Sequence, residues 1–294
     1  MERKPRVTIV GSINMDLVTI TSQVPQVGET LFGEQFHMNP GGKGANQAVA
    51  AARLGAHVQL IGCVGTDTFG KELVVHLEKQ GVDVTNVEPV TGSTGTASIT
   101  VAEGDNSIIV VPAANYRVTA DFVESKRDVI ANSDILVLQL EIPLEAVEKA
   151  VEIAHANNVK VILNPAPIQE LTAELISKVD YITPNEHEQL LLKQTHKEQE
   201  LAGKLIVTKG SQGVTITKAG QEIQIPAYKV DVVDTTGAGD SFNGGLACAL
   251  VRGLDLEEAC RFGNAVGALS TTKLGAQSGM PTAEEVVAFI QNQA

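Results

Sequence analysis

The chain has 294 residues, enough for one large domain or two small ones, and 43% of them are hydrophobic. Aromatic residues make up only 3% and tryptophan is absent, so the core must be built from Val, Ile, Leu and Ala. The formal net charge of −13 argues against a nucleic acid partner, because binding to a phosphate backbone needs clustered Lys and Arg. It does not exclude a small anionic ligand, which a few backbone N–H groups can hold.

The cysteines and the apolar segments indicate a cytoplasmic protein. Cys63, Cys248 and Cys260 are odd in number and form no CxxC pair, so they are expected to be free thiols in a reducing compartment. The basic N-terminal segment has an apolar run of only about four residues, whereas a signal peptide needs about seven or more. No segment approaches the roughly 20 apolar residues of a membrane helix, so no membrane partner is expected.

Short β-branched segments alternate with Ala-rich or amphipathic ones along the chain. Helices are expected over 45–55 and over 145–158, the second just after Pro143, a residue suited to a first helical turn. The strands are expected over 7–13, 58–65, 134–141, 159–167, 181–185 and 205–210. Strand and helix in alternation, with nearly continuous apolar strands, predict a three-layer α/β fold in which helices flank a mainly parallel sheet.

Two regions show alternating polarity instead and predict antiparallel hairpins. One joins 15–22 with 30–38, and the other joins 94–102 with 106–112 through a turn at Glu103-Gly104-Asp105-Asn106. Both lie outside the βαβ rhythm, so a small antiparallel sheet projecting from the main layer is expected. A sheet with one apolar face needs a cover, either substrate or a second subunit.

The C-terminal third is expected to hold one more hairpin and three helices. The hairpin covers 214–225, with its turn at Ala219-Gly220. The helices are expected over 239–252, 256–272 and 283–292. Asp255 with Glu258, and Thr282 with Glu285, have the spacing of capping boxes, which fixes where two of these helices begin.

The segment 39–55 contains the first glycine-rich loop. It is not a Walker A loop, because Lys43 is followed by Gly44 rather than by Ser or Thr, and it lacks the third glycine of GxGxxG. Its glycines let the backbone approach a ligand, and Lys43 and Asn46 supply hydrogen-bond donors. The alternative is a glycine-rich turn in front of an Ala-rich helix, which is the more frequent meaning of such a loop on its own.

The second glycine-rich segment, DTTGAGDSFNGGL over 234–246, opens a predicted helix. Gly237 and Gly239 permit backbone conformations that other residues avoid, and the N–H groups of 237–240 would be free to point at an anion. Asp240 has two interpretations. It can be an ordinary helix cap, or it can take a proton from a hydroxyl that attacks phosphorus beside the anion pocket.

These motifs resemble the signatures of the ribokinase/PfkB family of carbohydrate kinases. The two strongest are GGKGANQA at 41–48 and DTTGAGDSF at 234–242. Further motifs follow in the same order as in the family: 11–16, the region of Glu141, 164–167, 183–188, 208–213 and 273–277. The resemblance covers nearly the whole chain and implies one domain over 1–294, with lid strands near 14–40 and 94–112 as a small β-subdomain.

The resemblance implies an ATP:sugar phosphotransferase that forms D-ribose 5-phosphate. Asp240 would be the base acting on the 5-hydroxyl, and the turn Thr236-Gly237-Ala238-Gly239 would be the anion hole for the transferring phosphoryl group. Carboxylates accept from sugar hydroxyls while Lys and Asn donate to them. The positions matched to sugar binding are Asn14, Met15, Asp16, Gly42, Lys43, Gly44, Ala45, Asn46, Glu141 and Asp240.

The same resemblance implies ATP with Mg²⁺, a K⁺ activator and a homodimer formed through the lid. Asn185 and Glu188 match the NxxE motif, in which Glu188 acts on Mg²⁺ indirectly. The K⁺ positions are Asp234, Thr236, Ser270, Lys273, Gly275 and Gly279. The nucleotide positions are Asn185, Thr208, Lys209, Gly210, Ser211, Gln212, Gly213, Gly239, Asp240 and Asn264.

One segment departs from the family's pattern. Residues 186–204 are fewer than expected and lack most of a helix before the strand at 205–208. This departure predicts a looser sheet edge on the nucleotide side and leaves the sugar motifs intact.

Several of these residues also have a purely structural interpretation. Asp16 could face solvent at a strand end, Lys43 could be a surface lysine, and Glu141 could bias a helix start electrostatically. Asn185 and Glu188 could only open a helix. The position of Asn14 two residues before Asp16, the glycines around Lys43, and the strand end before Glu141 favour the functional interpretation in each case.

Other functions stay open beside the sugar kinase. The same chemistry could serve another small sugar, such as 2-deoxyribose or fructose. A non-catalytic sugar or nucleotide sensor is disfavoured because it has no use for Asp240 beside the Gly237-Ala238-Gly239 turn. An NAD-binding oxidoreductase is disfavoured because the strand, the GxGxxG loop and the downstream acidic residue do not occur together.

Overall fold

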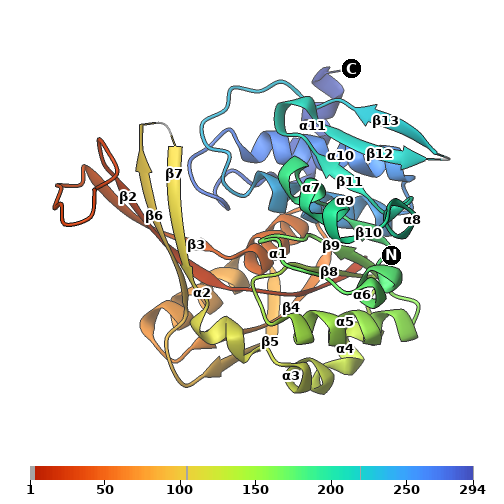
Figure 1. Ribbon diagram of the computed structural model, residues 1–294, viewed down its shortest axis with the longest axis horizontal. Coiled ribbons are helices and arrows are strands. Elements are labelled where there is room, and N and C mark those ends of the chain that lie inside the picture. Colours follow the sequence, from red (N-terminus) through yellow and green to blue (C-terminus); the bar gives the residue numbers. More distant parts are fainter. Residues whose placement is uncertain (1–3, 104, 219, 294) are drawn as a thin grey trace.

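Six parallel strands form the central sheet, as the alternation of strands and helices predicts (Figure 1). The computed structural model describes residues 4–103, 105–218 and 220–293. The strand order is β10-β9-β8-β1-β4-β5. The strands are β1 Arg6–Val10, β4 His57–Gly65, β5 Val82–Val90, β8 Ile135–Leu138, β9 Lys160–Leu163 and β10 Tyr181–Ile182. Several are shorter than expected, and β5, with its mixed sequence, had no strand prediction.

Alternate side chains of each strand enter two separate cores, so both faces of the sheet are covered. Ile9 and Val137 belong to one core, while Val10 and Leu138 belong to the other. The first core also takes side chains from α1 Lys43–Arg53, α2 Thr68–Lys79, α9 Ala238–Val251, α10 Leu256–Ser270 and α11 Ala283–Gln293. The second takes them from α3 Ala120–Ser125, α4 Arg127–Ala131, α5 Leu144–Ala156 and α6 Ala173–Lys178. The three-layer α/β fold is confirmed.

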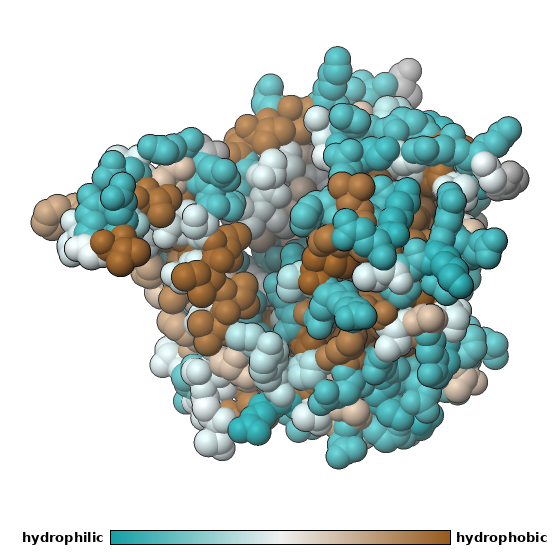
Figure 2. Space-filling model, viewed as in Figure 1, coloured by the Kyte–Doolittle hydropathy of each residue, from teal (hydrophilic) through white to brown (hydrophobic). Residues whose placement is uncertain are grey.

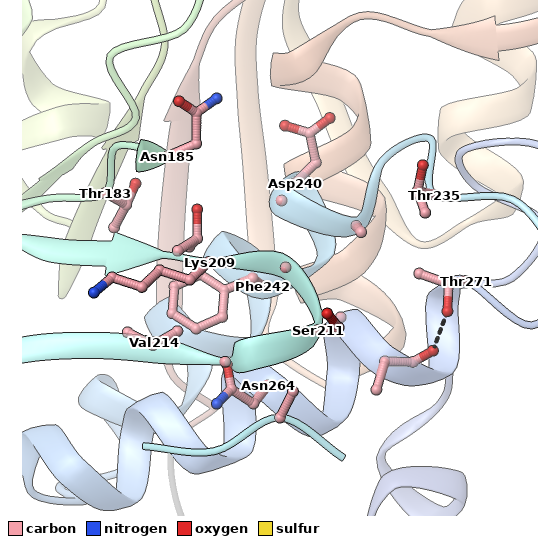
Figure 3. A pocket seen from close by; sticks show the side chains of 18 of the residues that line it. Thr183, Asn185, Lys209, Ser211, Val214, Thr235, Asp240, Phe242, Asn264 and Thr271 are labelled. Atoms are coloured by element: carbon pink, nitrogen blue, oxygen red, sulfur yellow. Dashed lines mark hydrogen bonds between the residues drawn. The ribbon is translucent and has the colours of Figure 1, made fainter. Parts of the chain in front are cut away.

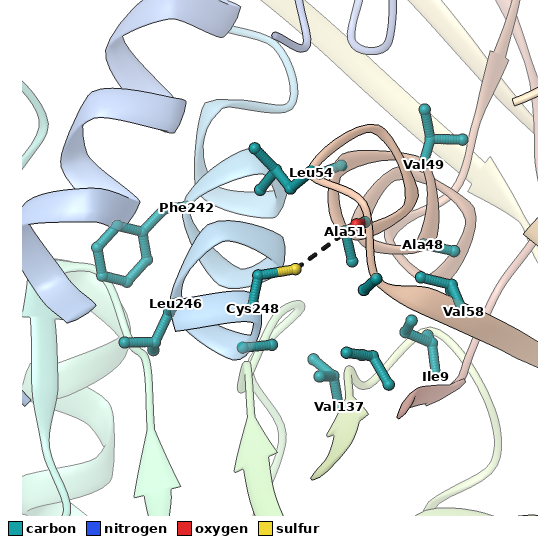
Figure 4. Close-up of a cluster of buried hydrophobic side chains, with 14 of the residues drawn as sticks. Ile9, Ala48, Val49, Ala51, Leu54, Val58, Val137, Phe242, Leu246 and Cys248 are labelled. Carbon is teal, nitrogen blue, oxygen red and sulfur yellow. Dashed lines mark hydrogen bonds between the residues drawn. The ribbon is translucent and has the colours of Figure 1, made fainter. Parts of the chain in front are cut away.

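Small side chains allow α1 and α9 to lie against each other over the sheet (Figure 4). A Cβ atom added to Gly244 of α9 would lie 2.6 Å from the Cβ of Ala50 in α1. The Sγ of Cys248 donates to the carbonyl oxygen of Ala51 at 3.5 Å. Cys63, Cys248 and Cys260 are all buried free thiols, and burial raises the pKa of each to about 12.

A second sheet projects from the main body, and we call it the lid sheet (Figure 1). Its strand order is β3-β2-β6-β7, formed by β2 Asn14–Ile20, β3 Gln35–Gly41, β6 Gly95–Ala102 and β7 Asp105–Val111. Both predicted hairpins are present, although Gly104 of the second turn lies outside the described residues. The expected antiparallel sheet is in fact mixed, because β2 and β6 pair in parallel.

The edge of the lid sheet is apolar and exposed. Every residue of β7 is exposed, and Ile108, Ile109, Val110 and Val111 are between 41% and 70% accessible. Figure 2 shows hydrophobic side chains on the projecting sheet and a hollow between that sheet and the main body.

The strand at 205–208 does not belong to the parallel sheet, which corrects the sequence-based assignment. β11 Ile206–Thr208 pairs with β12 Val214–Lys218, and β12 pairs with β13 Gln221–Ile225, all antiparallel. Among the described residues, two isolated parallel bridges, Ile182 to Leu205 and Asn185 to Thr208, join the end of β10 and the residues after it to the segment that contains β11. The predicted 214–225 hairpin is confirmed, with Ala219 of its turn outside the described residues.

The short segment before β11 folds into two helices and is attached to α6 by hydrogen bonds. It forms α7 Glu186–Thr195 and α8 Glu198–Leu201. The Nζ of Lys204 then donates to the carbonyl oxygens of Ile176, Ser177 and Val179, at 2.7, 2.9 and 2.8 Å. These three bonds tie the segment to the end of α6, while the expectation of a looser sheet edge on the nucleotide side stays a prediction.

The starts of the C-terminal helices agree with the capping predictions. Asp255 and Glu258 form a capping box at the start of α10. Thr282 and Glu285 exchange the corresponding two hydrogen bonds in front of α11. Pro143 lies one residue before α5 as its N-cap residue, rather than inside the first turn. In the described ranges, none of the helices has both the length and the apolar character needed to cross a membrane.

Candidate active site

Asp240 is not the cap of its helix. Gly237 occupies the N-cap position of α9, and Asp240 is the third residue of the helix. Its side chain is 7% exposed and points across to α1, where Oδ2 accepts from Nδ2 of Asn46 at 3.0 Å. The capping interpretation is therefore wrong. The carboxylate lies between the two glycine-rich segments that the sequence singled out.

The two glycines of the opening turn of α9 serve different purposes. Gly237 has φ of +77°, and a Cβ atom there would lie 2.9 Å from both the Cβ and the carbonyl oxygen of Ala276. Gly239 has no positive φ, so the prediction that it needs a conformation other residues avoid is wrong. A Cβ on Gly239 would meet open space, and that space is the large cavity described below.

The opening turn offers fewer free amides than the sequence predicted. The N–H of Ala238 donates to the carbonyl oxygen of Thr235 at 3.1 Å. In the part of the chain that the structure describes, the N–H groups of Gly239 and Asp240 meet no backbone acceptor. Unpaired amides at a helix N-terminus can hold an anion, because the positive end of the helix dipole is also there.

The lid strand β2 presents two polar side chains on one face. Asn14 is 2% exposed and Asp16 is 9% exposed, whereas Met15 between them belongs to the hydrophobic core. Gly41 on the neighbouring strand has no room for a side chain, because its Cβ would lie 2.2 Å from an oxygen of Asp16. The glycine leaves room for a carboxylate, and the solvent-facing interpretation of Asp16 is wrong.

Asn115, which no sequence motif singled out, fixes the amide of Asn14. It is fully buried, and its Nδ2 donates to Oδ1 of Asn14 at 2.7 Å. Its Oδ1 accepts from the N–H of Ile13 at 2.9 Å, which defines the orientation of the Asn115 amide. The Nδ2 of Asn14 is thereby left to donate to a ligand. Nothing in the local sequence around Asn115 distinguishes it, because its partners lie about a hundred residues away.

Glu141 binds the loop that carries Lys43. Its Oε2 accepts from the hydroxyl of Ser12 at 2.5 Å and from the backbone N–H of Lys43 at 3.1 Å. The N–H groups of Gly44 and Ala45 donate to the side chain and the carbonyl oxygen of Ser12. Gly44 and Ala45 therefore anchor α1 to the end of β1, and Glu141 lies beyond the carboxyl end of β8 as expected.

Lys43 lies among four carboxylates. Burial acts to lower the pKa of the Lys43 ammonium, but the surrounding negative charges outweigh it and raise the pKa above its usual range. Those charges belong to Asp240, Glu141, Glu188 and Asp16. Burial, reinforced by Glu141 and Asp240, raises the pKa of Asp16 to about 7. The surface interpretation of Lys43 is wrong, since this ammonium is the positive charge at the centre of an acidic cluster.

A cavity of about 1090 Å³ extends from Lys43 along the opening turn of α9 (Figure 3). Asp240 and Asn185 lie near one end of it, and Val214 and Asn264 lie further along. All of the expected nucleotide positions except Gln212 line it. The amide of Asn264 also donates to the carbonyl oxygens of Ile225 and Pro226, at 3.2 and 3.0 Å, so it fixes the wall as well as forming part of it.

The far wall of the cavity is apolar and was not predicted. It is formed by the segment after β13 and by the facing side of α10, through Ala227, Tyr228, Val230, Val232 and Ala268. Val232 is 59% exposed despite its size. Apolar residues recur over 226–233, between the hairpin and the second glycine-rich segment, although Lys229, which also lines the cavity, and Asp231 interrupt them. This pattern was a signal that could have located the wall. A flat apolar wall suits the face of an aromatic ring.

Asn185 and Glu188 form a capping box and also line the cavity. Oδ1 of Asn185 accepts from the N–H of Glu188, and Oε2 of Glu188 accepts from the N–H of Asn185, both at 2.8 Å. Burial raises the pKa of Glu188, against the opposing hydrogen bond from Asn185 and the charge of Lys43. The pair therefore opens α7, as the structural interpretation expected, and these bonds use Oε2 but not Oε1 of Glu188.

Two loops meet beside the opening turn of α9 at the expected K⁺ positions. The carboxylate of Asp234 joins them, because Oδ1 accepts from the N–H of Thr236 at 2.9 Å and Oδ2 from that of Gly275 at 2.8 Å. Burial acts to raise the pKa of Asp234, but these hydrogen bonds hold it below its usual range. A Cβ on Gly279 would lie 2.0 Å from the carbonyl oxygen of Ser270. The loops that Asp234 joins also carry main-chain carbonyl oxygens, a kind of ligand that can replace the hydration shell of K⁺.

Comparisons with known proteins identify sugar kinases as relatives of this chain. The family model for pfkB family carbohydrate kinases matches residues 4–283. A ribokinase of Bacillus subtilis (strain 168) is 45% identical over 285 residues, which cover 95% of this chain and 97% of the relative. A deoxyribokinase of Salmonella typhi is 36% identical over 295 residues, which cover 95% of this chain and 96% of the relative.

A solved structure extends the similarity to three dimensions. The structure of Arabidopsis thaliana ribokinase complexed with ribose and ATP matches with a TM-score of 0.90 and 30% identity, over 98% of this chain and 99% of that one. The chain therefore belongs to the pfkB family of carbohydrate kinases. The family and the enzyme class expected from the sequence motifs, an ATP-dependent sugar kinase, are confirmed.

Proposed function

We propose that this protein transfers the terminal phosphoryl group of ATP to the 5-hydroxyl of D-ribose and forms D-ribose 5-phosphate and ADP. The main support is the position of Asp240. Its carboxylate is bound to the sugar-side residue Asn46, and its own N–H and that of Gly239 are the amides at the opening of α9 that meet no backbone acceptor among the described residues, beside the nucleotide cavity. The hydroxyl proton, the migrating phosphoryl group and the nucleotide would then meet at one point.

In this proposal Asp240 accepts the hydroxyl proton while the opening turn of α9 stabilises the phosphoryl group. Gly237, Ala238 and Gly239 shape that turn, and the N–H groups of Gly239 and Asp240 are the available donors. The sugar would be held by Asn14, Asp16, Lys43, Asn46 and Glu141, with Gly42, Gly44, Ala45 and Met15 shaping the site behind them. The adenine ring would lie along the apolar wall.

Mg²⁺ and K⁺ are proposed as the ions of this site. Glu188 is the carboxylate that would reach Mg²⁺, through water, and the ion would neutralise charge on the phosphates. Asp234 and the carbonyls of Thr236, Ser270, Lys273 and Gly275 would hold K⁺, with Gly279 leaving room for the Ser270 carbonyl. In the described residues no group of three or more His, Cys, Asp or Glu side chains could hold a metal, so both ions depend on few side chains.

We further propose that the protein is one cytoplasmic domain that dimerises through the lid sheet. The exposed Ile108–Val111 run on the edge strand β7 supports this, because an apolar edge strand is a template for association. Analytical sedimentation of the parent protein and of an Ile109→Lys variant tests the proposed dimer. The parent protein should be dimeric and the variant monomeric.

A sugar panel tests the proposed substrate. ADP release should be fastest with D-ribose, should require Mg²⁺ and should rise when K⁺ replaces Na⁺. The relative named deoxyribokinase makes 2-deoxyribose the second candidate. A higher kcat/KM for 2-deoxyribose or fructose than for ribose would reject ribose as the substrate but keep the kinase, and no ADP release with any sugar would favour a sensor.

The proposed sugar contact of Asp16 predicts a pH dependence of ribose binding. An ionised carboxylate accepts two hydroxyl hydrogen bonds, whereas its protonated form accepts fewer. Because the pKa of Asp16 is raised to about 7, ribose affinity should be full above pH 7 and should weaken by about tenfold per pH unit below it. Calorimetric titration without nucleotide measures this dependence. An Asp16→Asn variant should bind weakly and with no change between pH 6 and 8, taken as roughly one unit on either side of that pKa.

A further inference from the structure

The second carboxylate oxygen of Asp240 has its own donor, which the proposed function does not use. Oδ1 accepts from Nε2 of Gln47 at 2.9 Å, while Oδ2 accepts from Asn46 at 3.0 Å. Gln47 follows Asn46 directly in α1 and is fully buried. The two amides therefore hold both oxygens of the carboxylate from one side, and each oxygen keeps a lone pair for a substrate hydroxyl.

The amide of Gln47 is held in one orientation. Its Oε1 accepts from Nε2 of Gln139 at 2.6 Å, and its Nε2 also reaches Oδ1 of Asn164 at 3.3 Å. A flipped amide would set its oxygen against the carboxylate of Asp240 and its nitrogen against the nitrogen of Gln139. The N–H of Gln47 therefore always faces Asp240, and the carboxylate cannot rotate without losing it.

Close packing of α1 against α9 brings the amide of Gln47 within hydrogen-bonding distance of Asp240. A Cβ on Gly244 would lie 2.6 Å from the Cβ of Ala50 and 3.1 Å from the carbonyl oxygen of Gln47, so any larger residue would push α1 away from α9. Gln47 lies inside the GGKGANQA motif, but no role was assigned to it because the Ala-rich sequence that follows predicts a packing helix.

We propose that Gln47 is a positioning residue for Asp240, whose carboxylate it keeps aimed at the reacting hydroxyl. This inference rests on the proposed role of Asp240 as the base. Asp240 is buried, and its two carboxylate oxygens accept from the side-chain amides of Asn46 and Gln47. A hydrogen bond has a preferred direction, so loss of the Gln47 donor would free the carboxylate of Asp240 to turn away from the hydroxyl. Gln47 touches neither sugar nor nucleotide in this proposal, so it acts on turnover and not on binding.

A double-mutant cycle tests the proposal. Gln47→Met keeps the length of the side chain and removes the donor. It should lower kcat by about 10- to 100-fold, while the Kd values of ribose and of an ATP analogue change less than about threefold. In an Asp240→Asn background the same substitution should change the residual kcat by less than about threefold, because the group that Gln47 positions is already gone.

The control separates positioning from a general loss of stability. Thr8→Val removes another buried hydrogen bond, to Oγ of Ser133, on the strand β1 beside α1. It should lower Tm to a similar degree and leave kcat unchanged. Equal losses of kcat from Gln47→Met in both backgrounds, or no loss in the parent enzyme, would overturn the positioning role. If Asp240→Asn alone kept normal turnover, the base assignment would fail instead, independently of Gln47.

Discussion

Asp240→Asn should lower kcat by about 10²- to 10⁴-fold, the range for loss of a general base, while ribose and ATP still bind. The asparagine has almost the same shape, and one of its two polar atoms can still accept a hydrogen bond from the amides of Asn46 or Gln47. It cannot accept a proton from the hydroxyl. A coupled assay of ADP release gives kcat, and calorimetry gives the Kd of ribose.

An equivalent change away from the site provides the control. Asp255→Asn alters the N-cap residue of α10, where asparagine caps as well as aspartate. That variant should match the parent protein in both Tm and kcat. Should Asp240→Asn retain kcat within tenfold of the parent, another group must take the proton, and the arrangement around Asp240 would be structural.

The sequence located the acidic and glycine-rich groups of the site because each motif is local. GGKGAN and DTTGAGD each place their chemistry within a few residues, and the end of a parallel strand explains Glu141. The residues that orient those groups were not found. Gln47 and Asn115 make their decisive contacts across separations of 193 and 101 residues, and a single sequence carries no signal for such pairs.

In the fold too, features set by nearby residues could be predicted, whereas features set by distant strand pairing could not. Helix starts at Asp255 and Thr282 agree with the capping patterns because the capping bonds span three residues. The strand at 205–208 was assigned to the wrong sheet, because its apolar run fits either neighbour and only long-range pairing with β12 decides. Likewise, the polarity pattern of β2 and β6 is the same in a parallel and an antiparallel pair, so the mixed lid sheet could not be anticipated.

Gly237→Ala should lower kcat by about 10²- to 10³-fold, comparable with the loss of one donor to a transition-state anion. Its new Cβ would lie 2.9 Å from the Cβ and carbonyl oxygen of Ala276, and φ is +77°. The opening turn of α9 must then move away from the 270–279 loop, taking the N–H groups of Gly239 and Asp240 with it. Steady-state kinetics and thermal unfolding measure the two consequences.

The other end of the same helix separates backbone strain from displacement of the turn. Gly253 follows α9 with φ of +86°, and a Cβ there would meet nothing within 4 Å. Both alanine variants therefore carry the left-handed strain of about 1–2 kcal/mol, but only Gly237→Ala displaces the opening turn. We expect similar losses of Tm from strain, a further loss for Gly237→Ala, and normal kcat for Gly253→Ala. If Gly237→Ala kept normal kcat despite its lower Tm, the opening turn would not be where the phosphoryl group is stabilised.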